Sequence, residues 1–168
     1  MDAKEFNSHF LSLADKLFRM AKSMLQDSDE AKDAVQDLQL KLWEKRDALK
    51  TADNRVTFTL KVLRNLCIDK LRRKHDSEEL KPEMEHHTQN QHQQLEVRDM
   101  ANYASLLMDK LPEIQRSVMR MRDVEEMEIV EIASILDITE NAVSVNLSRA
   151  RAKIRTQLLM ELQTIKHR

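Results

Sequence analysis

The sequence predicts an all-α protein, and three features of its composition support that fold class. None of the 168 residues is glycine, and only two are proline. The frequent residues, among them Leu, Glu, Lys, Gln, Met and Ala, are good helix formers. Without glycine the chain has no P-loop or GxGxxG phosphate-binding turn, because those backbones need a positive φ or close approach to a ligand.

Three amphipathic helices are expected in the first 75 residues. The first runs from about Lys4 to Leu25, and the second follows Asp27 and Ser28, which can cap it. The third runs from about Arg55 to Lys74. The apolar residues at helical spacing, expected to face the core, are Phe6, Phe10, Leu13, Leu17, Met20, Ala21 and Met24, then Ala31, Ala34, Val35, Leu38 and Leu42, then Phe58, Val62, Leu66 and Leu71.

Four helices are expected near the C-terminus. One runs from about Leu95 to Lys110, and Pro112 suits the first position of the next, which ends near Asp123. A short helix ends at Leu136. Thr139 then caps a long last helix. The apolar stripe expected along that helix is Val143, Leu147, Ala150, Ile154 and Leu158.

Residues 76–95 break these helical patterns. The segment is acidic, contains Pro82, and is rich in Gln and His. Because few of its residues can bury surface, we interpret it as a flexible linker. It divides the chain into domains at residues 1–75 and 96–168, which we expect to pack weakly against each other.

A flexible linker predicts where a protease cuts. We expect limited proteolysis of the free chain to cleave first within Asp76–Gln94, because exposed polar segments are the preferred sites of nicking. Mass spectrometry of the first fragments tests this. Early cleavage elsewhere, with this segment protected, would contradict a tether.

Charge is concentrated in two of the expected helices, although the formal net charge is −1. Residues 55–74 contain seven Lys/Arg and one acid, and residues 139–168 contain six Lys/Arg and two acids. Such sorting favours a nucleic-acid surface, to which Arg72 and Arg73 can contribute. The alternative at each site is a basic helix face exposed only to solvent.

Residues 128–155 carry the strongest local signal. A short helix, the tight connection Asp137-Ile138 and a long helix started by Thr139 have the spacing of a helix-turn-helix motif. In such motifs the second helix presents its first turns to the major groove, while cations such as Arg151 contact phosphates. An ordinary helical hairpin remains the alternative. The residues beside or opposite the apolar stripe are Ser144, Val145, Asn146, Ser148 and Arg149.

Several classes of function are excluded by what the sequence lacks. A single cysteine, Cys67, allows no internal disulfide or multi-cysteine zinc site, and we expect it to be small and buried. His86, His87 and His92 lie in the expected linker without the scaffold of a metal site. No catalytic constellation is present, so we expect no enzyme activity, cofactor or metal. The polar start and the lack of a long apolar run predict a cytoplasmic protein without membrane insertion.

Three sequence blocks, taken together, resemble one protein family. These blocks are AKDAVQDLQLKLW from Ala31, RNLCIDKLRRK from Arg64 and LPEIQRSVMRMRDVEEMEIVEIASILDITENAVSVNLSRARAKIR from Leu111. In this order, around a linker, they resemble the extracytoplasmic-function (ECF) sigma factors of bacterial RNA polymerase, of the sigma-70 family. The resemblance covers nearly the whole chain. It implies a transcription initiation factor without catalysis, whose partners are core polymerase and promoter DNA, with an anti-sigma factor as a further candidate.

The resemblance also implies roles for particular residues. In the first block, the contact with the clamp helices of the largest polymerase subunit would be made by Asp33, Gln36, Asp37 and Lys41. The loop that captures a flipped base of the minus-ten element would be Ala52, Asp53, Asn54, Arg55 and Val56, with Asn65 beside it. The minus-thirty-five element would be read by Ser144, Val145, Ser148 and Arg149.

The chain departs from the family pattern at several of these places. The family often has basic residues where Ser144 and Asn146 stand, which implies fewer phosphate contacts and a distinct upstream sequence. Phe58 stands where the family often has Trp. Asp137 replaces a frequent turn glycine, and we expect it to adopt the left-handed conformation that Asp tolerates.

Two other classes of function remain open from the residues alone. A stand-alone helix-turn-helix regulator would use the N-terminal domain for sensing or dimerisation. A helical adaptor that binds only proteins would leave both basic helices as solvated faces. Binding to core polymerase would distinguish a sigma factor from both of these alternatives. DNA binding in the absence of polymerase would distinguish the regulator from the adaptor.

Overall fold

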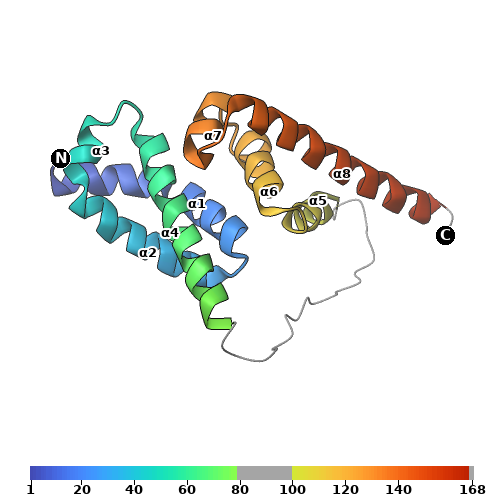
Figure 1. Ribbon diagram of the computed structural model, residues 1–168, viewed down its shortest axis with the longest axis horizontal. Helices are drawn as coiled ribbons and strands as arrows, with labels where there is room; N and C mark the ends of the chain where they lie inside the picture. Colours follow the sequence, from blue (N-terminus) through green and yellow to red (C-terminus); the bar gives the residue numbers. More distant parts are fainter. Residues whose placement is uncertain (79–99, 167–168) are drawn as a thin grey trace.

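The computed structural model describes residues 1–78 and 100–166, and every regular element in these ranges is helical (Figure 1). This confirms the all-α prediction. The N-terminal elements are α1 (Ala3–Leu25), α2 (Ser28–Glu44), α3 (Arg46–Thr51) and α4 (Arg55–Glu78). The C-terminal elements are α5 (Met100–Asp109), α6 (Glu113–Met119), the π-helical turn η2 (Arg120–Val124), α7 (Ile129–Leu136) and α8 (Glu140–Lys166).

Each of the first two helices begins at an aspartate that caps it, and the cap of α2 at Asp27 is the one that the sequence predicts. Asp2 accepts the Glu5 amide at 2.7 Å, and Asp27 accepts the amides of Asp29 and Glu30 at the start of α2. Gln26, between them, adopts a left-handed conformation with φ of 56°. The α1 and α2 helices pack against each other and against α4, with Leu17, Ala21 and Leu38 among the buried side chains.

Helix α3 and part of the buried face of α4 were not predicted from the sequence. The side chains expected to face inward on α4, such as Phe58 and Val62, are only partly buried, whereas Leu60, Leu63 and Cys67 are inaccessible to solvent. The reason is that α4 is enclosed on more than one side, since it packs against α1, α2, α3 and α7. The Cys67 thiol is buried as predicted, and burial raises its pKa to about 12.

In the C-terminal unit, α6 begins one residue later than predicted. Pro112 has an extended ψ of 144° and precedes the helix, which starts at Glu113. After Met119 the backbone widens into the π-helical turn, in which the Glu125 amide reaches the Arg120 carbonyl at 3.0 Å. Helix α8 packs on α5, α6 and α7 and completes the C-terminal unit.

The two units are in direct contact, although the sequence predicted only weak packing between them. Helix α4 lies against α7, and α1 lies against α6 (Figure 1). Arg19 pairs with Glu125, and the Gln26 side chain donates to the Asp109 carbonyl at 2.6 Å. The α4 helix extends into the first residues of the predicted linker, and residues 79–95 of that segment lie outside the described ranges.

Candidate nucleic-acid and protein-binding interfaces

The connection between α7 and α8 has the tight geometry of a helix-turn-helix. Asp137 ends α7 in the left-handed conformation, with φ of 57° and ψ of 46°, as its substitution for glycine predicts. The Ile138 amide donates to the Ala133 carbonyl at 3.1 Å, and its side chain packs against the core. Thr139 accepts the Ala142 amide at 3.1 Å, so it caps α8 as expected. These contacts fix the direction in which α8 leaves the turn.

The left-handed backbone at Asp137 leads to a stability prediction. Asp137→Val should destabilise the chain by about 1–2 kcal/mol, because a β-branched side chain clashes in this conformation. Asp137→Asn is the matched control and should change the free energy of unfolding by less than about 0.5 kcal/mol, since Asn tolerates the same region. Urea unfolding followed by circular dichroism measures both. Equal stability of the two variants would contradict the backbone argument.

The first turns of α8 present one apolar and one accessible face. Val143, Leu147 and Ala150 are buried in the C-terminal unit. The opposite positions that the sequence analysis singled out are exposed: Ser144, Val145, Ser148 and Arg149. A helix with this exposure, directly after the turn, can enter a DNA major groove without disturbing the core.

Two of the candidate DNA-binding side chains on α8 have partners in the protein. The Asn146 side chain is partly buried and donates to the Ala142 carbonyl at 2.8 Å, which directs it along the helix. Arg151 forms a bidentate ion pair with Asp123 of η2, and the Arg151 Nε donates to Asp123 at 3.0 Å. The hydrogen bond to Asp123 raises the pKa of the Arg151 guanidinium. Arg149 carries no such carboxylate partner in the residues described.

In the N-terminal unit, the predicted base-capturing loop lies between α3 and α4. Asn54 starts α4 by accepting the Thr57 amide at 3.0 Å, and its amide nitrogen donates to Glu131 of α7 at 3.0 Å. Arg55 pairs with Glu5 at 2.8 Å. Asp53 is exposed, whereas Ala52 and Val56 are partly buried. The loop is therefore held by its own cap on α4 and by contacts with α1 and α7.

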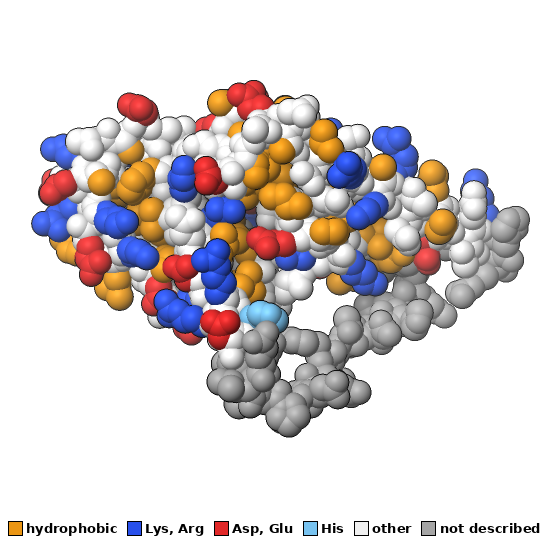
Figure 2. Space-filling view, in the orientation of Figure 1, with side chains coloured by type: hydrophobic (Ala, Val, Ile, Leu, Met, Phe, Trp, Pro, Cys, Tyr) orange, Lys and Arg blue, Asp and Glu red, His pale blue; other side chains and the backbone are white. Residues whose placement is uncertain are grey.

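Further along α4, the remaining candidates are accessible to solvent. Asn65, Arg72 and Arg73 are all exposed. On the face shown in Figure 2, Lys and Arg side chains are interspersed with Asp and Glu over both units, and no broad area of one sign is visible. Mixed charge of this kind supports only weak sequence-independent binding to DNA, because such binding depends on an excess of cations.

The candidate protein contact lies on the outer face of α2. Asp33, Gln36 and Asp37 are exposed and Lys41 is partly exposed, so the structure brings these residues to one side of the helix. Asp37 pairs with Lys70 of α4 at 2.8 Å. Leu40 on the same helix was not among the predicted contact residues, yet its side chain is 68% exposed. Its signal in the sequence is an apolar residue outside the buried stripe of α2.

The described residues hold no group of three or more His, Cys, Asp or Glu side chains that could bind a metal ion. The three linker histidines weighed as a metal site lie outside the described ranges. Within those ranges, the helices are too short or too polar to cross a membrane.

Comparison with known proteins identifies the two units. Residues 10–76 match the family described as Sigma-70 region 2, and residues 102–154 match Sigma-70, region 4. The chain is similar to the ECF RNA polymerase sigma factor SigW of Bacillus subtilis (strain 168), with 24% identity over 166 residues. That alignment covers 86% of this chain and 83% of the relative.

Solved structures agree on the fold. The sigma factor RpoE of Bartonella quintana, solved in complex with the anti-sigma factor NepR, matches with a TM-score of 0.73 and 23% identity, covering 94% of this chain and 98% of that one. CnrH, solved with the cytosolic domain of CnrY, matches with a TM-score of 0.68 and 20% identity, covering 94% and 89%. Two sigma regions in the order of the family, together with these relatives, show that the chain belongs to the ECF class of sigma-70 factors, which direct RNA polymerase to promoters.

Proposed function

We propose that this chain reads two promoter elements with its two units, at the residues assigned above. Residues 1–75 would dock on core polymerase and recognise the minus-ten element. Residues 96–168 would recognise the minus-thirty-five element, and residues 76–95 would join the two. The observation that carries the proposal is the exposed first-turn face of α8, directly behind a well-formed helix-turn-helix connection.

The upstream element would be read in the major groove by α8. Ser144, Val145 and Ser148 are short side chains that let the helix approach the base edges closely, and Arg149 can pair with guanine O6 and N7. Asn146, which is bonded to its own helix, would contribute less than these residues. Arg151 would contact a phosphate after releasing Asp123.

The downstream element would be bound by the α3–α4 loop and the exposed side of α4. Ala52, Asp53, Asn54, Arg55 and Val56 would form the pocket for an unpaired base, with Asn65 beside it. Arg72 and Arg73 would neutralise phosphates further along the strand. Phe58 offers a smaller stacking surface than the Trp frequent in the family.

The partner of α2 would be the clamp helices of the largest polymerase subunit, contacted by Asp33, Gln36, Asp37 and Lys41. A second partner would be an anti-sigma factor, because the structural relative RpoE was solved in complex with the anti-sigma factor NepR. The other relative, CnrH, was also solved with a bound protein, the cytosolic domain of CnrY. The chain would act in the cytoplasm, where polymerase is, and would have no catalytic activity of its own.

Run-off transcription with core polymerase and a library of genomic promoter fragments tests the proposal. We expect transcripts from a small set of fragments that share two spaced elements, and none from core polymerase alone. DNA binding without any binding to core polymerase would instead indicate a stand-alone helix-turn-helix regulator. Binding to neither would indicate an adaptor.

A further inference from the structure

We propose that Asp123 competes with a promoter phosphate for the guanidinium of Arg151, and thereby limits how tightly α8 holds DNA. This inference rests on the proposed function and deepens it, because it names the group that restrains one of the cations assigned to phosphate contact. The ion pair that carries the inference joins η2 to α8, so it lies wholly within the C-terminal unit.

Arg151 lies on the face of α8 that is proposed to enter the groove. It follows Ser144 by seven residues and Ser148 by three, and residues at these spacings lie on one side of a helix. All three residues are exposed. The guanidinium is therefore on the DNA side of the helix, about one turn beyond the serines expected to lie against the bases.

The ion pair occupies the part of the guanidinium that is suited to a phosphate. Arg151 Nε donates to Asp123 Oδ2 at 3.0 Å, and Arg151 Nη2 donates to Asp123 Oδ1. Two parallel N–H groups of this kind bind a carboxylate or a phosphate in the same bidentate geometry. A phosphate can bind to this edge of Arg151 only when Asp123 leaves it, so the two anions compete for one site.

The pair is also exposed enough to be exchanged. The side chain of Arg151 is 47% exposed and that of Asp123 is 29% exposed. Water and salt screen such a pair, which shifts an equilibrium by about fivefold or less. After release, the Asp123 carboxylate stays near the bound strand and repels its phosphates. We therefore expect Asp123 to lower the affinity for DNA by a few-fold, without abolishing binding.

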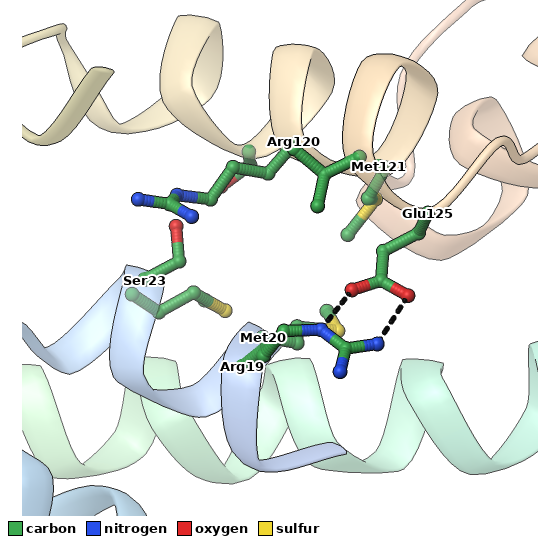
Figure 3. Close-up of a pocket in the computed structure, with 9 residues that line it drawn as sticks. Arg19, Met20, Ser23, Arg120, Met121 and Glu125 are labelled. Carbon is green, nitrogen blue, oxygen red and sulfur yellow. Dashed lines mark hydrogen bonds and ion pairs between the residues drawn. The ribbon is translucent and has the colours of Figure 1, made fainter. Parts of the chain in front are cut away.

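Nearby carboxylates do not take the place of Asp123. Glu125 binds Arg19 of α1, which donates to both of its oxygens (Figure 3). Glu126 is exposed and forms no ion pair in the ranges that the structure describes. Removing the charge of Asp123 should therefore free Arg151, whereas removing the charge of Glu126 should not.

Holoenzyme binding to promoter fragments tests the competition. Asp123→Asn keeps the size of the side chain and removes its charge, so it should tighten binding about two- to fivefold at low salt. The gain should be similar on all promoters and leave the preferred minus-thirty-five sequence unchanged, because phosphate contacts carry no sequence information. Glu126→Gln is the matched control, since it removes one negative charge three residues away, and it should leave the affinity unchanged.

The same substitution in an Arg151→Ala background shows whether Asp123 acts through Arg151. Without the arginine, Asp123→Asn should increase the affinity much less, because only the repulsion of the strand is relieved. Equal gains in both backgrounds would overturn the competition, since the carboxylate would then act on DNA directly. Weaker binding after Asp123→Asn alone would also overturn it, because Asp123 would then hold Arg151 in the orientation that binds the phosphate.

Nuclear magnetic resonance of the free chain measures the ion pair without polymerase or DNA. The Nε–H proton of Arg151, identified by its loss in Arg151→Lys, should exchange slowly with solvent and faster after Asp123→Asn. Exchange that is equally fast in both chains would overturn the pair. If no holoenzyme bound a promoter, the proposed function would fail and this inference with it. Promoter binding that did not respond to Asp123→Asn would overturn this inference alone.

Discussion

Reversing two charges on α2, by Asp33→Lys with Asp37→Lys, is expected to weaken binding to core polymerase by about 100-fold or more while the chain stays folded. Both side chains are exposed and lie off the buried stripe of the helix. Like charges forced together at a complementary protein interface cost several kcal/mol, and about 2.7 kcal/mol corresponds to that factor. Binding of labelled chain to core polymerase, measured by fluorescence anisotropy, gives the two affinities.

The stability cost of this double substitution should be small. Asp37 loses a half-exposed ion pair with Lys70, and such pairs contribute about 0–1 kcal/mol. Asp47→Lys with Asp76→Lys is the control, because it makes the same total charge change at exposed positions outside α2. If the folded α2 variant bound core polymerase as tightly as this control, the docking face would have been assigned to the wrong surface.

The second large effect separates base reading from phosphate contact on α8. Ser144→Ala or Arg149→Ala should change which minus-thirty-five sequence is preferred, by about 1–3 kcal/mol at one base position, because these residues lie where a helix meets base edges. Arg151→Ala should weaken binding to all promoters about equally and reduce the salt dependence by about one phosphate contact.

The measurement is holoenzyme binding to a randomised upstream element at several salt concentrations. Lys166→Ala, an exposed cation at the far end of the same helix, is the control and should change neither preference nor salt dependence. A preferred sequence that shifts with Arg151→Ala and not with Arg149→Ala would mean that α8 enters the groove in another orientation.

The parts of the molecule that could be predicted from sequence are those specified by neighbouring residues. The turn before α8 follows from Asp137, which tolerates the left-handed region, and from Thr139, whose hydroxyl caps the next helix. Both signals lie within three residues of the feature they determine. The long stripe of α1 is equally local, because it repeats with the helical period.

The features that could not be predicted from the sequence depend on contacts between residues far apart in the chain. Arg151 meets Asp123 across 28 positions, and Asn54 meets Glu131 across 77, so no spacing rule relates them. Helix α3 has six residues and no side-chain cap, which leaves it without a start signal. The roles assigned to the candidate binding residues remain predictions, since the structure gives their positions and exposure but not what they bind.

The number of residues in the π-helical turn after α6 determines the direction in which the following side chains point around the helix axis. Its backbone hydrogen bond spans five residues, from Glu125 to Arg120, where an α-helix spans four. Deleting one residue here would restore an ordinary helical path and rotate all that follows by about 100° around the helix axis. Glu125 would then point away from Arg19, and their ion pair would be lost although both residues were kept. A one-residue insertion or deletion in this turn would therefore change how the two units contact each other, whereas a substitution would keep the register.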